Sequence, residues 1–276
     1  MISVTQWIFG IEPLEETARR LADTGYDGIE LSGEPDDVTA AGARAIVEPL
    51  GLAVSSICGI YTPERDLSHP DPSVRRAGID YVRRCAELGA ELGAGVVIVV
   101  PTAVGRTQPL EDAESEWNWA VESIAEAAGA IPAEGPRIVL EALNRYETYL
   151  VNSLDRAEQL RQAVGSDRVA LMADLFHMNI EEDDVVDSVR AHAAQIAHVH
   201  LADSNRREPG RGHTDFAGVL AALDETGYAG ALTMEFLPPT ANPYLAASLD
   251  VPADVKRELA ASGLAHIRSL REVPTT

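Results

Sequence analysis

The chain alternates short apolar runs with helix-length amphipathic stretches, and this alternation occurs eight times. The apolar runs lie at about residues 2–9, 27–31, 52–59, 95–101, 136–142, 169–174, 196–201 and 231–236. Such runs are typical of strands that are buried on both faces of a parallel sheet. Eight strands, each followed by a helix, predict an α/β fold of the (β/α)8 TIM barrel type. A length of 276 residues suits one barrel, so we expect a single domain over residues 1–276.

Local signals agree with this count of elements. Pro13 stands where a first helical turn would begin, and Gly25 follows ETARRLADT as a stop signal. One face of the stretch 71–92 is apolar, which predicts a helix packed on the outside of the barrel. That face carries Ile79, Val82, Cys85 and Leu88. The acidic run 181–184 is interpreted as the solvated start of the sixth helix.

Four side chains that favour metal ions stand one each at the ends of four consecutive strand patterns. They end the runs in PRIVLEAL, RVALMAD, IAHVHL and ALTMEF, and are Glu141, Asp174, His200 and Glu235. The carboxyl ends of the strands in a closed parallel barrel meet at one mouth, so the four side chains would converge. Three carboxylates and one imidazole suit Mn²⁺, Co²⁺, Mg²⁺ or Zn²⁺. The sequence therefore predicts one divalent metal site and leaves the choice among these ions open.

The two glutamates in this set suggest a reaction. A metal ion on a ketone oxygen acts as a Lewis acid and stabilises an enediolate. Glu141 and Glu235, on the fifth and eighth strands, would face each other across the mouth. One carboxylate could then remove an α-proton while the other returns a proton to the opposite face. We interpret the pair as acid–base groups that invert a carbon next to a carbonyl.

Plainer interpretations of these residues also exist. A single carboxylate at a strand end is often a helix cap or a salt-bridge partner, and only the conjunction of four favours a metal site. His198 shares one side of its strand with His200, because side chains alternate along a strand. His198 is therefore an alternative ligand, or a partner of the ligand.

Three loops that follow strand patterns are longer than a connection needs, at residues 60–72, 101–111 and 202–216. The loops at the carboxyl ends of the strands build the active site in a barrel of this kind. We therefore expect these loops to form the walls and lid of the site.

The charge balance and the rarest residue types exclude several function classes. A formal net charge of −22 repels nucleic-acid backbones and anionic membrane surfaces, so neither is an expected partner. Lys256 is the only lysine and lies in the C-terminal amphipathic stretch, which leaves a Schiff-base mechanism without a good candidate. Cys58 and Cys85 form no disulfide pattern, and MISVTQWIFG resembles neither a signal peptide nor a membrane anchor. We expect a reduced, cytoplasmic protein.

Four stretches, LEALNRYETYLVNS, DLFHMNIEE, HVHLADSNRREPGRG and GYAGALTME, resemble the xylose isomerase-like TIM barrels, and within them the D-tagatose and D-allulose (psicose) 3-epimerases. The resemblance covers nearly the whole chain. It implies an enzyme that inverts C3 of a free ketose through an enediolate, with one Mn²⁺ or Co²⁺ per chain, or alternatively Mg²⁺ or Zn²⁺. It also implies a homodimer or a homotetramer.

The same resemblance assigns roles to individual residues. It implies that the four strand-end residues are the metal ligands and that Glu141 and Glu235 double as the catalytic pair. It further implies that Glu147, His177 and Arg206 bind the sugar near its carbonyl end.

Departures from the family pattern leave the sugar open. PTAVGRTQ contains no tryptophan where these epimerases often have one, and MEFLPP stands where MEPF is common. The alternatives that keep the site are an isomerase of hydroxypyruvate or a keto-inositol, and a lyase of 3-oxo-glycosides. A DNA-repair endonuclease of the same superfamily is disfavoured by the acidic charge. A non-catalytic sugar-binding protein is disfavoured because both glutamates are intact.

Overall fold

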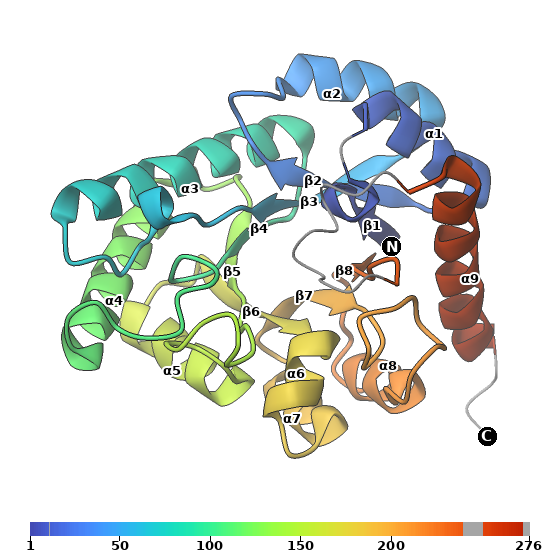
Figure 1. The fold of residues 1–276 in the computed structure, drawn as a ribbon. Helices are drawn as coiled ribbons and strands as arrows, with labels where there is room; N and C mark the ends of the chain where they lie inside the picture. Colours follow the sequence, from blue (N-terminus) through green and yellow to red (C-terminus); the bar gives the residue numbers. More distant parts are fainter. Residues whose placement is uncertain (11, 240–250, 273–276) are drawn as a thin grey trace.

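The strands form a closed, wholly parallel barrel surrounded by helices (Figure 1). The structure is a computed structural model that describes residues 1–10, 12–239 and 251–272. The strands are β1 (Ile2–Thr5), β2 (Gly28–Gly33), β3 (Ala53–Gly59), β4 (Val96–Val99), β5 (Arg137–Leu140), β6 (Val169–Asp174), β7 (Ile196–Leu201) and β8 (Ala231–Met234). β1 pairs with both β2 and β8, with Ile2 opposite Leu232, so the sheet formed by the described residues has no edge strand. The eight-stranded barrel expected from the sequence is confirmed.

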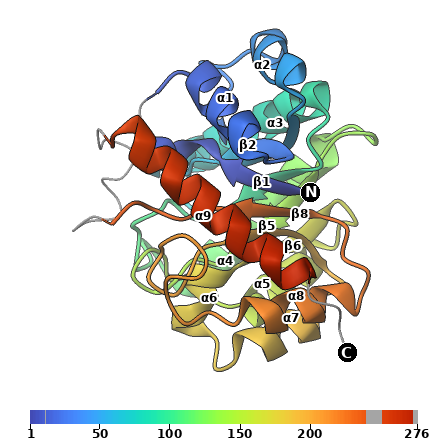
Figure 2. The same ribbon diagram turned by 90° about the vertical axis from the view of Figure 1, so that its right-hand side faces the viewer.

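Helices follow the strands around the outside of the barrel. They are α1 (Leu14–Thr24), α2 (Ala40–Val47), α3 (Pro72–Leu92), α4 (Ala113–Ala130), α5 (Leu154–Val164), α6 (Leu175–Glu181), α7 (Val185–His192), α8 (Phe216–Asp224) and α9 (Ala253–Glu272). Three 3₁₀ helices, η1 (Gln6–Phe9), η2 (Glu48–Leu50) and η3 (Pro63–Arg65), complete the described elements. α9 packs between α1 and α8 and closes the outer ring (Figure 2). No described helix is both long and apolar enough to cross a bilayer.

The barrel interior divides into an apolar and a polar part. Alternate residues of each strand point inward. A small apolar cluster comes from β3 to β6 and consists of Cys58, Val96, Ile98, Val139, Ala170 and Met172. Polar side chains from the other strands contact one another, as Ser3 and Thr233 do at 2.7 Å. The larger core lies between the strands and the helices, where the predicted face of α3 is buried as expected.

The first strand and the sixth helix differ most from expectation, whereas the limits of the other strands agree within two residues. The first strand ends at Thr5, because the chain then turns across the barrel mouth as η1. Ile8 and Phe9 lie in this short helix and are buried. The apolar residues that suggested a longer strand therefore pack into the core from a 3₁₀ helix. The acidic run 181–184 does not begin the sixth helix. α6 starts directly after Asp174, and the run ends α6 and supplies the cap of α7 at Asp184.

Candidate metal centre

The four strand-end residues lie together in one buried cluster. One ligand atom from each of Glu141, Asp174, His200 and Glu235 lies within 4.8 Å of the others, and all four residues are buried. Asp174 and His200 belong to β6 and β7, whereas the two glutamates directly follow β5 and β8. The strand hydrogen bonds continue to these glutamates, because each backbone N–H donates to a neighbouring strand across 3.0 Å. The donor set could therefore hold one cation.

Two fully buried polar atoms in this cluster have no hydrogen-bond partner. Asp174 Oδ1 caps α6 by accepting from the backbone N–H groups of Phe176 and His177, at 2.8 and 3.0 Å. Asp174 Oδ2 and His200 Nδ1 are buried and make no hydrogen bond, although they lie 3.5 Å apart. Buried polar atoms of this kind are costly unless a partner binds them. Their position fits a divalent cation that takes one lone pair from each.

The two glutamates of the cluster have opposite ionisation tendencies. Burial, and then the charge of Glu235, raise the pKa of Glu141 well above its usual value. Burial acts in the same direction on Glu235, but His200 and Arg206 hold the pKa of Glu235 down to about 2. The pKa values of acid and base partners in enzymes are often moved apart in this way by their surroundings. A cation among the carboxylates would favour the ionised form of both.

Arg206 and Trp7 hold the carboxylate of Glu235 from two sides. Arg206 Nη2 donates to Glu235 Oε2 at 3.0 Å, and Trp7 Nε1 donates to Glu235 Oε1 at 3.1 Å. The guanidinium carbon also lies 4.6 Å from the centre of the Phe176 ring. Arg206 has a φ of 59°, which is rare for a residue other than glycine. Trp7 could not be identified from the sequence, because a strand was expected over residues 2–9. The turn into η1, which directs Trp7 towards Glu235, was not expected.

Asn144 orders the two other residues that the resemblance placed near the substrate. Its side-chain amide donates to Glu147 Oε1 at 2.9 Å, and its backbone N–H donates to His177 Nδ1 at 3.1 Å. The ring hydrogen of neutral His177 is therefore on Nε2. Burial lowers the pKa of His177 to about 3, which keeps the ring neutral. Sequence reasoning missed Asn144, although it stands inside LEALNRYETYLVNS.

A cavity of about 300 Å³ opens next to the cluster. Glu141, Glu147, His177, Arg206 and Glu235 form its polar end, and Tyr61 and Val104 belong to its apolar wall. Its lining thus includes residues from each of the three long loops, as expected for walls of the site.

His198 does not join the cluster, because its Nε2 contacts Glu30 Oε2 at 2.9 Å, below the mouth. Sequence reasoning missed Glu30 as well.

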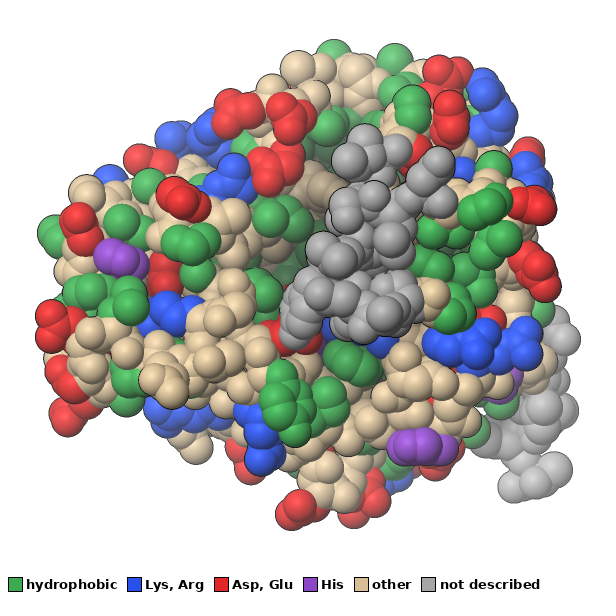
Figure 3. Space-filling view, viewed as in Figure 1, with side chains coloured by type: hydrophobic (Ala, Val, Ile, Leu, Met, Phe, Trp, Pro, Cys, Tyr) green, Lys and Arg blue, Asp and Glu red, His purple; other side chains and the backbone are tan. Residues whose placement is uncertain are grey.

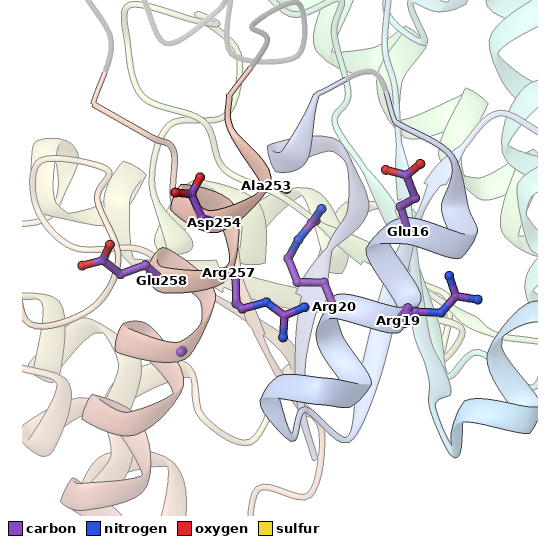
Figure 4. A pocket seen from close by; sticks show the side chains of 8 residues that line it. Glu16, Arg19, Arg20, Ala253, Asp254, Arg257 and Glu258 are labelled. Atoms are coloured by element: carbon purple, nitrogen blue, oxygen red, sulfur yellow. The ribbon is translucent and has the colours of Figure 1, made fainter.

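A second cavity, of about 620 Å³, lies outside the barrel between α1 and α9 (Figure 4). Its arginines are already paired with acids. Arg20 contacts Glu12 at 2.6 Å, and Arg257 contacts Asp23 at 3.2 Å. The strand-end residues are absent from its lining. The cavity at the barrel mouth is therefore the better candidate for chemistry.

The face at the barrel mouth carries acidic and basic side chains in mixture (Figure 3). The part of the chain that is described there shows no continuous basic surface of the kind that holds nucleic-acid backbones. The lack of a continuous basic surface on this face agrees with the acidic net charge.

Known proteins resemble the chain in sequence and fold. L-ribulose 3-epimerase from Mesorhizobium japonicum is 33% identical over 223 residues, which are 80% of this chain and 75% of that protein. D-psicose 3-epimerase from Ruminiclostridium cellulolyticum is 30% identical over 224 residues, 78% of this chain and 75% of that protein. A solved structure of L-ribulose 3-epimerase matches with a TM-score of 0.86 and 27% identity, covering 100% of this chain and 99% of that one. The family model described as Xylose isomerase-like TIM barrel matches residues 18–268. The chain therefore belongs to the xylose isomerase-like TIM barrel family.

Proposed function

We propose that this protein is a metal-dependent epimerase that inverts C3 of a free ketose. The observation that carries the proposal is the buried cluster, in which Glu141 and Glu235 lie beside two unpartnered ligand atoms of Asp174 and His200. The adjoining cavity of about 300 Å³ is at the small end of the range for small-molecule sites, which suits a monosaccharide. The relatives named above are 3-epimerases, which supports this chemistry over isomerisation of hydroxypyruvate or a keto-inositol and over lyase chemistry.

Glu141, Asp174, His200 and Glu235 would hold the metal ion. When bound, the ion would polarise the ketone oxygen and stabilise the negative charge that develops on this oxygen as C3 loses its proton. Three carboxylates and one imidazole nitrogen suit Mn²⁺ or Co²⁺, with Mg²⁺ and Zn²⁺ as alternatives.

The acid–base work falls to Glu141 and Glu235. One carboxylate removes the proton from C3 and gives an enediolate, and the other delivers a proton to the opposite face of C3. Trp7 Nε1 and Arg206 Nη2 each donate to one oxygen of Glu235, and so fix the plane of that carboxylate. Glu141 enters from β5 and Glu235 from β8, which is consistent with access to the sugar from two sides.

Glu147, His177 and Arg206 would bind the substrate near its carbonyl. His177 Nε2 and Arg206 Nη1 lie 3.5 Å apart, and both carry hydrogens, so they cannot satisfy each other. Both donors are therefore available to one oxygen of the sugar. Glu147 Oε1 lies 3.6 Å from Arg206 Nη1 and would accept from a neighbouring hydroxyl.

We also propose that the protein is cytoplasmic. Both cysteines are free and buried, which is consistent with a reducing cytoplasm. We also propose a homodimer or homotetramer, and light scattering on the purified protein measures this directly.

A ketose panel with defined metals tests the function. The protein is stripped with a chelator, reloaded separately with Mn²⁺, Co²⁺, Mg²⁺ or Zn²⁺, and incubated with free hexuloses and pentuloses in D₂O. We expect C3 epimers as products, with deuterium at C3 and none at other carbons. Metal-loaded protein that exchanges no C3 proton in any ketose would contradict the proposal.

A further inference from the structure

A buried carboxylate from β2 lies directly behind the histidine of the cluster. Glu30 is 0% exposed. His200 Nε2 contacts its two oxygens at 3.1 and 3.2 Å, and His198 Nε2 contacts Oε2 at 2.9 Å. Ser56 Oγ also donates to Oε2, at 2.6 Å. Three donors from β3 and β7 thus converge on one side chain of β2.

The contacts of Glu30 decide which nitrogen of His200 faces the barrel mouth. A carboxylate can only accept, so the Nε2 atom of His200 must carry a hydrogen in this contact. The other ring nitrogen, Nδ1, is buried without a hydrogen-bond partner and lies 3.3 Å from Glu235 Oε2. The imidazole of His200 is therefore fixed by the contact of Nε2 with Glu30, while Nδ1 faces the cluster.

Glu30, His198 and His200 also form a group whose ligand atoms lie close enough to hold a cation. Their contacts argue against a second metal site. The Nε2 atoms of both histidines already meet the Glu30 carboxylate at hydrogen-bond distance, whereas the mouth cluster contains the unpartnered Asp174 Oδ2 and His200 Nδ1. The group below the mouth is thus a support and the cluster above it is the binding site.

We propose that Glu30 is a positioning residue that orients His200 for metal binding. It fixes the ring plane and the tautomer so that Nδ1 keeps its lone pair for the cation, and its negative charge makes that nitrogen a stronger donor. This inference rests on the proposed metal site. His198 and Ser56 restrain the carboxylate from two further directions, so the support is built from β2, β3 and β7 together.

Metal affinity of Glu30→Gln tests the proposal. Glutamine keeps the shape but offers one acceptor oxygen and an NH₂ group, so at least one of the two histidines faces a donor. We expect Co²⁺ and Mn²⁺ affinity, measured by competition with a chromogenic chelator, to fall about 10- to 100-fold. Glu116→Gln is the matched control, because Glu116 is also 0% exposed but pairs with Arg106 away from the cluster. The control should bind metal as the wild type does.

The outcomes separate this inference from the proposed function. If the wild-type protein binds no divalent metal, the proposed function fails. If the wild type binds metal and Glu30→Gln binds it equally well, the function stands and the role of Glu30 is wrong. Should Glu30→Gln not fold, Glu30→Asp keeps the charge but moves it one methylene away from His200, and we expect about 10-fold weaker binding. Unchanged affinity in Glu30→Asp would then overturn the proposal.

Nuclear magnetic resonance gives an independent measure of the same role. With ¹⁵N-histidine and diamagnetic Zn²⁺, the Nε2–H proton of His200 should be visible and exchange slowly in the wild type. In Glu30→Gln we expect faster exchange or loss of this signal, whereas Glu116→Gln should retain it. A residue that only fills space would leave the signal unchanged.

Discussion

Arg206 Nη2 lies 3.0 Å from Glu235 Oε2, and this contact joins the loop after β7 to the residue that follows β8. Replacing Arg206 by Lys keeps the charge but removes the planar fork that reaches Glu235, Glu147 and His177 together. We expect kcat/KM on the active ketose to fall about 10- to 100-fold, the usual cost of a lost hydrogen bond to a charged group. Arg207→Lys is the control, because Arg207 is 39% exposed and pairs with Glu208. Equal loss in both variants would show that the effect is not specific to Arg206.

Glu235→Gln should abolish turnover and leave the fold intact. The substitution removes one acid–base group, and such groups contribute about 10²- to 10⁴-fold. Circular dichroism and the melting temperature report the fold, and metal analysis at saturating Mn²⁺ separates loss of the ion from loss of the base. Glu225→Gln, at an exposed surface pair with Arg190, should behave as the wild type. Wild-type turnover by Glu235→Gln would remove Glu235 from the mechanism.

Chelation should lower the melting temperature, because a cation that binds only the folded chain stabilises it by mass action. At a free metal concentration 100-fold above Kd the gain is about 2.7 kcal/mol, which corresponds to roughly 5–10 °C in a protein of this size. Scanning calorimetry with and without Mn²⁺ measures the shift. Asp174→Asn should show little or no shift, although Oδ1 can still cap α6. A wild-type protein whose melting is indifferent to metal would argue against a built cation site.

Stability should fall in acid through Glu12. Burial alone would raise the pKa of Glu12, but hydrogen bonds from Arg20, Lys256 and Thr17 lower it from 4.5 to about 2. A depressed carboxyl pKa means that the unfolded chain binds the proton more readily. The stabilisation is therefore complete above about pH 4.5 and is lost as the pH falls towards 2, by an amount of the order of 2 kcal/mol.

Urea unfolding from pH 7 to pH 3 measures this contribution. Glu12→Gln should be less stable than the wild type at pH 7, and the difference should shrink in acid. Glu15→Gln is the matched control, because its pair with Arg19 is about 60% exposed and such pairs contribute little. A difference between Glu12→Gln and the wild type that does not depend on pH would contradict the assignment.

The placement of the cluster could be predicted from the sequence because strand ends obey a simple geometric rule. Asp174 is the last residue of β6 and His200 the last but one of β7, and Glu141 and Glu235 come one residue after their strands while still in the ladder. Inward-facing residues of parallel strands meet at the mouth whatever the helices between them do. The cluster can therefore be predicted without knowing how the loops fold.

The supporting residues could not be predicted, because their contacts span large sequence separations or depend on turns. Glu30 is a single acid within an apolar run, and its partner His200 lies 170 positions away. Trp7 reaches Glu235 only because β1 stops at Thr5 and the chain turns into η1. The strand-end position favoured His200 over His198 as the ligand, but the alternation along β7 puts both on the same side and did not exclude His198. The structure distinguishes them, because both contact Glu30 but only His200 also lies among Glu141, Asp174 and Glu235.

The ion pair at Lys256 has a practical consequence for handling the protein. Lys256 is the only lysine in the sequence, its side chain is 10% exposed, and its ammonium lies 2.8 Å from Glu12 Oε2. Side-chain amine crosslinkers and ester dyes therefore have one poorly accessible target, on the outer wall between α1 and α9. Immobilisation through lysine would be inefficient, but it would leave the candidate site at the barrel mouth uncovered.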